Sequence, residues 1–452
     1  LGLAQQAGHE VTADSDAADV LVVNTCAFID GAKQESVNAI LEMAQRKHAG
    51  RPRRLVVTGC LAERYREELR KEIPEIDAVL GTGEVPRFVD AIEGRDLTPA
   101  SSDAPPGGRT APVALYRRNG ANTAAPAAPR RVPARHRGGA VARELPTYIY
   151  EASTPRVLAT PRHFAYVKVA EGCDYACSFC IIPTLRGRYR SRDADDIVRE
   201  AHALAAQGVK ELILVSQDTT FYGVDRREKG ALAPLLRALS DVAGLEWIRL
   251  LYLYPTTITD DVLDVMADSA KVCRYVDLPL QHCARPVLER MRRPGDRTSY
   301  ARLLRRIRDR VPGVSLRTTF IVGFPGETDA DVQDLLGFVR EIEFDHVGVF
   351  TYSHEEDTAA WALDDDVPAP EKTRRRDAVM KLQREIVTRR HARRRGERVR
   401  AIVDGPAPEH DLVLCGRLEC QAPDIDPVVY FTECDPAALP PGSLVEAEIV
   451  AA

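Results

Sequence analysis

The feature that most constrains the fold is a series of six apolar strand segments between residues 161 and 390. These segments are FAYVKVA, ELILVSQ, EWIRLLYL, YVDLPL, VSLRTTFIVG and HVGVFTYS. Stretches with helical periodicity, such as DADDIVREAHALAAQG, separate them. Strands that alternate with helices form parallel sheets with crossover helices. We therefore expect an α/β domain over 161–390, built as an open sheet or a partial (β/α)6 barrel.

Three further regions flank or precede this domain. Residues 1–96 contain the apolar strands DVLVVNTCAF and RRLVVTGC, each followed by an amphipathic helix, which favours a doubly wound α/β domain. Residues 97–160 are rich in Pro, Ala, Gly and Arg without periodicity, which is typical of a mobile linker. Residues 391–452 hold short strand-like segments between turn residues, which indicates a small antiparallel β-barrel.

The amino-acid composition and the apolar runs indicate in which compartment the protein acts. Hydrophobic residues make up 44% of the chain and charged residues 29%, as in soluble globular proteins. No apolar run approaches the roughly 20 residues that span a bilayer, and the start lacks the layout of a signal peptide. We therefore expect a cytoplasmic protein with no membrane partner. Thiols stay reduced there, so clustered cysteines point to metal binding or catalysis.

Three of the ten cysteines lie in one loop directly after the first strand of the 161–390 domain. They are Cys173, Cys177 and Cys180, in the segment EGCDYACSFC. A structural zinc site needs four protein ligands, and a disulfide would leave one thiol over. Three thiolates can instead hold three irons of a [4Fe–4S] cluster and leave the fourth iron open to a ligand. Barrels of parallel strands keep their chemistry at the carboxyl ends of the strands, where this loop begins.

This loop, with Phe179 before the last cysteine, resembles the signature of the radical S-adenosylmethionine (SAM) superfamily. The resemblance implies that the open iron binds SAM and that SAM is split to a radical that abstracts hydrogen from carbon. GVKELILVSQD looks like the family's second-strand motif, which implies that Glu211 meets the SAM amino group. TTFIVGFPGET resembles the motif that packs on adenine, through Ile321 and Gly323. DLPLQH places Pro279, Gln281 and His282 where the family faces the cofactor.

Two other cysteines, Cys26 and Cys60, each end an N-terminal strand. Equivalent strand ends are neighbours in an α/β sheet, although buried structural cysteines are also common. VVNTCAF and VVTGC, ahead of a radical SAM domain and a small β-barrel, resemble the methylthiotransferase family. That family implies an auxiliary [4Fe–4S] cluster on three cysteines, here Cys26, Cys60 and a third expected upstream of Leu1. It also implies that the C-terminal barrel is a TRAM domain with an OB-like fold.

Charge suggests which substrate class this member takes. From Ala401 to Ala452 the chain has one basic residue, Arg417, against ten acidic residues. An acidic domain repels RNA phosphates and suits a basic protein. LVSQDTTFYG, WIRLLYLYP, FTYSHEEDTAA and CQAPDIDPVVYF resemble the subgroup that modifies an aspartate of small-subunit ribosomal protein number twelve. The alternatives are a transfer-RNA adenosine methylthiotransferase and a non-catalytic ribosome-binding protein that keeps its clusters for structure.

The resemblance thus implies methylthiolation of an aspartate β-carbon, with two [4Fe–4S] clusters and SAM as cofactors. One SAM would provide the radical and another the methyl group, while sulfur arrives through the auxiliary cluster. A one-electron reductant, a sulfur donor and the ribosomal protein are the expected partners of a monomeric enzyme. Of the remaining cysteines, we interpret Cys283 as a packing residue and Cys415, Cys420 and Cys434 as thiols of the C-terminal barrel.

Overall fold

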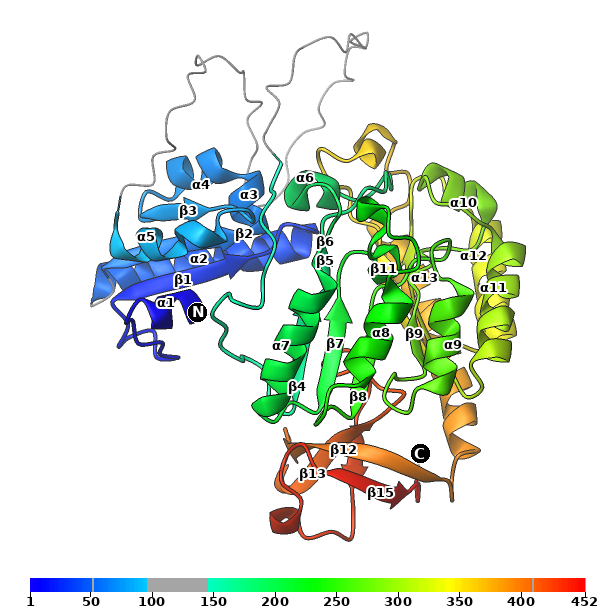
Figure 1. Ribbon diagram of the computed structural model, residues 1–452. Coiled ribbons are helices and arrows are strands. Elements are labelled where there is room, and N and C mark those ends of the chain that lie inside the picture. The colour runs from blue at the N-terminus through cyan, green and yellow to red at the C-terminus, as the bar shows by residue number, and fades with distance from the viewer. Residues whose placement is uncertain (51–52, 96–144, 409, 452) are drawn as a thin grey trace.

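The computed structural model describes residues 1–50, 53–95, 145–408 and 410–451, which form three parts (Figure 1). An N-terminal α/β part lies beside a larger central part, and a small β part lies below the central one. Most of the expected linker, residues 97–144, lies outside the described residues. Residues 145–160 carry no helix or strand, but they contact the central part, for instance through Arg156, which donates to Glu200 at 2.7 Å.

The N-terminal part is a parallel sheet of order β1-β2-β3 with helices on both faces. Leu55 and Val57 of β2 pack with Ile40 of α2, while Val56 packs on the other face with Ala91 of α5. This alternation confirms the expected doubly wound arrangement. The elements are α1 (Gly2–Gln6), β1 (Val20–Thr25), α2 (Asp30–Ala49), β2 (Arg54–Gly59), α3 (Cys60–Arg64), α4 (Arg66–Glu72), β3 (Ala78–Leu80), the 3-10 turn η1 (Val85–Arg87) and α5 (Phe88–Glu93).

The central part is an incomplete barrel of six parallel strands, and all six predicted segments form them. They pair as β4-β7-β8 and as β9-β10-β11, and a parallel bridge from Ile248 to Val272 joins the two sheets. Within the described residues no pairing closes β11 onto β4. The strands are β4 (Phe164–Lys168), β7 (Glu211–Val215), β8 (Trp247–Leu250), β9 (Tyr275–Asp277), β10 (Ser315–Val322) and β11 (His346–Thr351).

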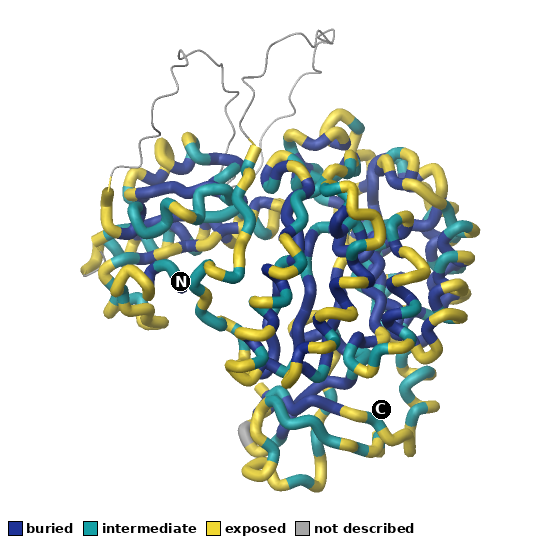
Figure 2. The backbone as a smooth tube through the Cα atoms, in the orientation of Figure 1, coloured by how far each residue is buried: buried dark blue, intermediate teal, exposed yellow. Residues whose placement is uncertain are grey.

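Helices cover the outer face of these strands and form the main core with them, and β7 and β8 are buried along nearly their whole length (Figure 2). Leu214 of β7 and Phe320 of β10, for example, face outward into this core with Leu236 and Leu335. The covering helices are α7 (Ala194–Ala206), α8 (Leu232–Ser240), α9 (Asp260–Asp268), α10 (Arg285–Arg290), α11 (Arg297–Arg310), α12 (Asp329–Ile342) and α13 (Ala369–Ala392). Shorter elements are β5 (Ala170–Glu171), α6 (Ile182–Arg186), β6 (Arg190–Ser191), η2 (Thr219–Phe221), η3 (Val224–Arg226) and η4 (Ala359–Ala362).

The C-terminal part is a four-stranded antiparallel sheet of order β14-β13-β12-β15, in agreement with the predicted short strands. Ile402 and Ala422 pack against Phe164, Trp247 and Tyr275, which begin their strands. This part therefore covers the amino-terminal edge of the barrel, as Figure 1 shows. Its elements are β12 (Arg398–Ala407), β13 (His410–Leu418), β14 (Val429–Phe431), η5 (Pro436–Ala438) and β15 (Leu444–Glu448).

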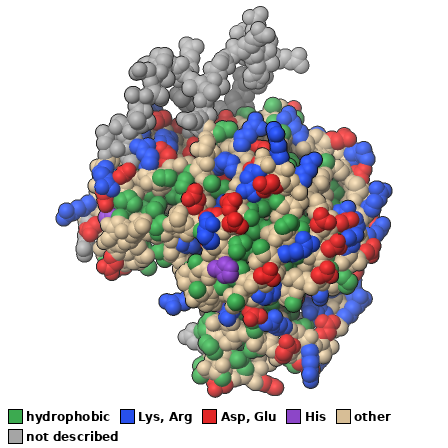
Figure 3. Space-filling model, viewed as in Figure 1, with side chains coloured by type: hydrophobic (Ala, Val, Ile, Leu, Met, Phe, Trp, Pro, Cys, Tyr) green, Lys and Arg blue, Asp and Glu red, His purple; other side chains and the backbone are tan. Residues whose placement is uncertain are grey.

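Across the described ranges, no helix combines the length and the apolar character that crossing a membrane requires. On the face shown in Figure 3, Lys and Arg side chains are interspersed with Asp and Glu over the barrel. That face therefore carries no extended field of one sign.

Candidate active site

The cysteine loop begins where β5 ends, at the carboxyl edge of the barrel. Gly172 adopts φ +89°, and a Cβ there would lie 2.1 Å from the carbonyl oxygen of Arg188, so the close turn requires glycine. The backbone N–H of Cys173 donates to the carbonyl of Gly187 at 3.1 Å. The N–H of Cys180 donates to the carbonyl of Cys177 at 3.2 Å. These contacts fold the three cysteines back against the segment that follows them.

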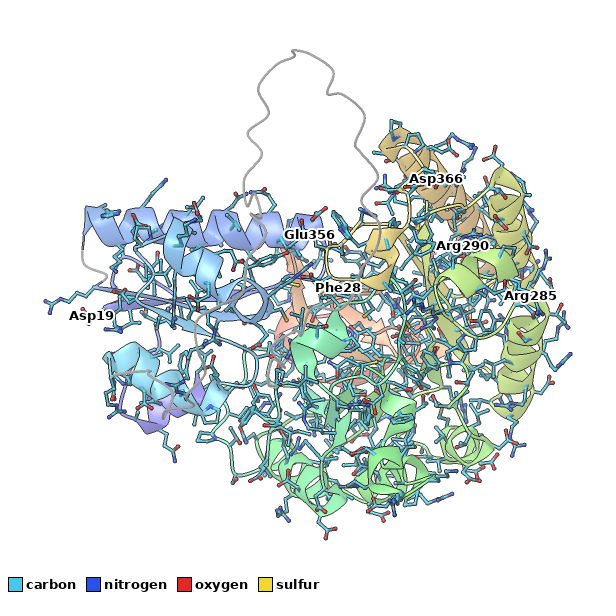
Figure 4. All side chains as sticks on the ribbon, turned by 90° about the horizontal axis from the view of Figure 1, so that it is seen from above. Asp19, Phe28, Arg285, Arg290, Glu356 and Asp366 are labelled. Atoms are coloured by element: carbon cyan, nitrogen blue, oxygen red, sulfur yellow. The ribbon has the colours of Figure 1, made fainter. Side chains whose placement is uncertain are left out.

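Ser178 anchors the loop to two neighbouring elements. Its N–H donates to Met291, its hydroxyl donates to the carbonyl of Arg290 at 2.7 Å, and its own carbonyl accepts from Ala360 at 2.7 Å. The side chain of Arg290 also donates to the carbonyl of Pro325. The backbone N–H of Gly326, the residue after Pro325, donates to the carboxylate of Asp366. Figure 4 shows Arg290 and Asp366 together at this edge. The loop is thus fixed between α10 and the 353–368 segment.

The thiols of this loop have raised pKa values. Burial raises the pKa of Cys173 to about 11 and that of Cys180 to about 12, and the charge of Cys177 adds to both shifts. The three sulfurs are therefore electrostatic neighbours. Thiolates, not thiols, bind metal, so the binding of iron must supply the positive charge that this pocket needs. Three neighbouring thiols at the carboxyl edge fit the donor set of a [4Fe–4S] cluster with one open iron.

Within the described ranges, no three His, Cys, Asp or Glu side chains form a group that could hold a single metal ion. The case for a cluster thus rests on the type and the neighbourhood of the thiols.

Three of the residues expected to contact SAM lie near the cysteine loop. Ile321 and Phe179, the residue before Cys180, pack against the same apolar cluster. Gln281 adopts φ +70°. Its backbone N–H donates to the carbonyl of Thr319, and its carbonyl accepts from the N–H of Ile321 at 2.7 Å. These two bonds continue the pairing with β10 beyond the end of β9. The carbonyl of Pro279 accepts from Arg293, which also contacts Cys177.

Gly323 lies at the end of β10, where the chain turns away from the strand. It has φ +74°, and its N–H donates to the carboxylate of Glu327. A Cβ at this position would lie 2.2 Å from Lys372. The structure therefore gives Gly323 a tight turn beneath α13. His282 is fully buried and lies 3.1 Å from the carboxylate of Glu327, so it contacts this turn from the segment after β9.

Glu211 requires a correction, because the structure places it away from the cysteine loop. It is the first residue of β7, at the amino-terminal edge of the barrel, and it is fully buried. Its carboxylate accepts from Arg249 at 2.7 Å and from Arg417 at 2.6 Å. Both oxygens are thus engaged by structural arginines. The motif resemblance implied that Glu211 meets SAM, but ligands lie at the opposite, carboxyl end of a parallel strand.

The carboxyl end of β7 carries Gln217 and Asp218, which the sequence analysis missed. Gln217 donates to Glu171 at 3.1 Å, and its amide oxygen is buried without a partner in the described residues. The hydroxyl of Tyr175, inside the cysteine loop, donates to Asp218 at 2.7 Å. Burial raises the pKa of Asp218, and the hydroxyls of Thr220, Tyr175 and Thr257 oppose that shift. Their position directly after ELILV was the signal that could have identified them.

Cys26 and Cys60 are neighbours, as the sequence predicted. The parallel register pairs Thr25 with Gly59, so the cysteines that follow leave the sheet side by side. Gly59 has φ +101°, and a Cβ there would lie 2.5 Å from the carbonyl oxygen of Thr25, so only glycine permits this approach. Burial raises the pKa of Cys60, Arg186 opposes that shift, and the charge of Cys26 adds to it. Their role as cluster ligands stays a prediction.

Arg186 connects the two sets of cysteines. Its Nη2 lies 3.4 Å from Sγ of Cys60, and its Nη1 lies 3.6 Å from the carboxylate of Glu171, two residues before Cys173. Ile181, the N-cap residue of α6, and Leu185, within α6, are buried in the core of the N-terminal part. The segment after Cys180 therefore belongs to both domains and holds Cys60 toward the barrel's carboxyl edge.

Comparison with known proteins agrees with this geometry. The radical SAM superfamily model matches residues 167–339, the model described as uncharacterized protein family UPF0004 matches 1–81, and a TRAM domain model matches 396–452. The structure of TsrM, a radical SAM methyltransferase from Kitasatospora setae, is similar in fold, with a TM-score of 0.50 and 18% identity over 74% of this chain and 61% of that chain. The fold and the cysteine loop thus define a radical SAM enzyme.

Curated relatives specify the family. The ribosomal protein uS12 methylthiotransferase RimO of Pelotomaculum thermopropionicum is 45% identical over 95% of this chain and 88% of its own length. The protein of the same name from Symbiobacterium thermophilum is 44% identical over 99% of this chain and 84% of its own. The chain belongs to this RimO family. Radical SAM methylthiotransferases use SAM and [4Fe–4S] clusters, and the thiols described above suit those cofactors.

Proposed function

We propose that this enzyme attaches a methylthio group to the β-carbon of an aspartate in ribosomal protein uS12. The observation that carries the proposal is the match to RimO proteins along nearly the whole chain, together with two cysteine sets that Arg186 brings toward each other. The comparisons do not favour transfer-RNA adenosine as the substrate.

In this proposal Cys173, Cys177 and Cys180 bind the SAM-cleaving cluster. Cys26 and Cys60 bind the auxiliary cluster, for which the family resemblance implies a third cysteine ligand. When bound, the SAM-cleaving cluster supplies the electron for radical formation, which lets the enzyme attack a C–H bond that no side-chain base could deprotonate. The apolar surface of Phe179 and Ile321 shields the site from water. Pro279 and Gln281 shape the neighbouring wall at the end of β9.

The acidic residues support a basic protein as the partner. However, the surface that such a partner would meet is not the C-terminal part, which the sequence suggested. Four of the acids counted in the C-terminal part contact the barrel instead of facing solvent freely. Asp404 pairs with His163, Glu419 accepts from the backbone of Arg274, Asp424 accepts from Tyr166, and Asp426 accepts from Tyr275. That part also lies at the edge of the barrel opposite the cysteine loop.

The segment 353–368, at the cysteine edge, carries the acids that a basic substrate would meet. Glu356 and Asp364 are partly or fully exposed there, and Trp361 is 46% exposed and lies against His354, with 4.3 Å between the ring centroids. The bond from Ala360 to Ser178 ties this segment to the cysteine loop. A polypeptide that reaches the cysteines from this side passes these residues, so charge complementarity favours docking here.

The remaining partners follow from the chemistry. The reaction needs a one-electron reductant and a sulfur donor. We place the enzyme in the cytoplasm, where ribosomal proteins are assembled, and propose that it acts as a monomer.

The direct test uses the protein reconstituted anaerobically with iron and sulfide. SAM, reductant and a sulfur source are supplied with either uS12 or a transfer-RNA anticodon stem. Mass spectrometry should show a gain of about 46 Da on an aspartate of uS12, and no gain with the Cys177→Ala variant. A gain on the RNA alone would overturn the proposal.

A second experiment locates the docking surface. Reversing charge at the cysteine edge, with Glu356→Lys and Asp364→Lys, should raise KM for uS12 about tenfold and leave kcat nearly unchanged. The matched control is Glu446→Lys with Glu448→Lys, which reverses two exposed acids of β15. If the control raises KM and the first pair does not, the substrate docks on the C-terminal part.

A further inference from the structure

Arg293 is a buried cation beside the cysteine loop that no step above uses. It lies between α10 and α11 and is 8% exposed. Its Nη1 lies 3.8 Å from Sγ of Cys177, and its Nη2 donates to the carbonyl of Pro279 at 2.7 Å. The guanidinium carbon lies 4.5 Å from the centre of the Tyr254 ring. Arg293 thus joins the cysteine loop to the end of β9.

What distinguishes Arg293 from other buried arginines is the absence of a carboxylate partner. Arg249, Arg417, Arg64 and Arg192 each pair with Asp or Glu. No ion pair to a carboxylate is formed by Arg293 among the residues that the structure describes, and its Nε is buried without a partner. A buried charge without compensation costs several kcal/mol. The sulfur of Cys177 lies within reach of Arg293, and a cysteine that binds iron does so as an anionic thiolate.

The surroundings hold the guanidinium in place. Tyr254, which lies against Arg293, stacks on Tyr175 of the cysteine loop with 3.9 Å between centroids and 8° between ring planes. A planar cation over an aromatic ring gains cation–π energy, and a guanidinium can address two acceptors at once. A lysine at this position would keep the charge but would lack the planar fork with which Arg293 addresses two acceptors from separate nitrogens.

We infer that Arg293 is a positioning residue for the SAM-cleaving cluster: it is the counter-charge of the Cys177 sulfur and eases the cluster's one-electron reduction. The inference rests on the part of the proposed function that makes Cys177 a cluster ligand. Reduction adds negative charge to the cluster, and a desolvated cation next to one ligand sulfur stabilises the more negative state. Hydrogen bonds and charge near ligand sulfurs are among the factors that set cluster potentials.

The test is a redox titration of reconstituted full-length protein, followed by electron paramagnetic resonance of the reduced cluster, without substrate. Arg293→Gln should disfavour reduction about tenfold, which is about 59 mV for one electron, while iron content is unchanged. Arg293→Lys keeps the charge but loses one of the two contacts, so its shift should be smaller. The matched control is Arg302→Gln, which removes an exposed arginine of α11 and should leave the potential unchanged.

Each result separates the inference from its rivals. An unchanged potential in Arg293→Gln with full iron content would overturn it. If Arg293→Gln fails to retain iron, retention in Arg293→Lys supports the charge role, and equal loss in both variants assigns Arg293 to packing alone. A shifted potential in an enzyme that leaves uS12 unmodified would keep this inference and overturn the proposed substrate. Retention of the SAM-cleaving cluster by Cys177→Ala would remove the basis of both.

Discussion

Arg64 and Glu355 form a buried ion pair between the N-terminal part and the barrel, with 3.2 Å between Nη1 and Oε2. Their side chains are 3% and 2% exposed, although 291 positions separate them in the sequence. Lys33 approaches the same carboxylate at 2.8 Å. Arg64 ends the short helix that Cys60 begins, and Glu355 follows β11. The pair therefore holds the Cys60 helix against the carboxyl edge of the barrel, at the junction where Phe28 and Glu356 lie in Figure 4.

Glu355→Ala should weaken this junction strongly. Removing one partner of a buried pair leaves an uncompensated charge, here on Arg64, at a cost of about 3 to 5 kcal/mol. We expect the N-terminal part to separate from the barrel at lower urea concentration and to become sensitive to limited proteolysis. Urea titration of the metal-free protein, followed by protease digestion, measures this.

Glu356→Ala serves as the neighbouring control, because only the backbone carbonyl of Glu356 binds Arg64, at 2.6 Å. Adding Arg64→Met to Glu355→Ala should recover part of the lost stability. Equal effects of the two alanine variants would contradict the role of the buried pair.

Sequence patterns predicted most of the strands, but they did not predict the contacts between domains. The six barrel strands could be recognised because mainly apolar segments alternate with helical stretches, although β9 itself has only three residues. The three-residue strand β3 of the N-terminal part was not predicted. The amphipathic helix that was expected after the second N-terminal strand breaks into α3 and α4 at Tyr65. Cys26 and Cys60 follow equivalent positions of two parallel strands, and this placement correctly predicted that they are neighbours. The pairing of Glu211 with Arg417 joins distant segments, and no local pattern encodes it.

The corrected role of Glu211 gives a prediction that separates stability from cofactor binding. Glu211→Gln leaves Arg249 and Arg417 buried without their shared carboxylate, so unfolding should become easier by about 3 kcal/mol or more. The affinity of the folded holoenzyme for SAM should not change, because Glu211 lies at the far edge of the barrel. Thermal unfolding and equilibrium dialysis with SAM measure the two effects. Weaker SAM binding in a stably folded variant would restore the original assignment.

Substituting a cysteine of the loop should have a different effect from substituting a cysteine of the main core. Cys180→Ala is expected to lose the iron of the SAM-cleaving cluster, because one of three thiolate ligands is missing. Cys283→Ala should keep its iron and lose about 1 kcal/mol of stability, since Cys283 is fully buried in the main core. Iron and sulfide analysis of the two reconstituted proteins provides the comparison. Iron loss in Cys283→Ala at unchanged stability would show that this thiol has been misread as a packing residue.

The attachment of the C-terminal part should depend on pH through Asp404. Its carboxylate accepts from His163 at 2.7 Å and from Arg417 at 2.8 Å. Burial opposes ionisation of Asp404, but these two partners outweigh burial and hold its pKa below the usual range. A lowered pKa in the folded state stabilises above the unfolded pKa of about 3.9, and this contribution is lost as pH falls below it.

The chain contains two tryptophans, so this attachment can be followed directly. Trp247 is buried against Ile402 of the C-terminal part, and Trp361→Phe leaves Trp247 as the sole fluorescent reporter. In that background, Asp404→Asn should cost about 2 kcal/mol near pH 7, as expected for hydrogen bonds to a charged group. The difference from the parent should shrink as pH falls through about 4 in the metal-free protein. A difference that stays constant down to pH 3 would show that the Asp404 charge does not hold the domains together.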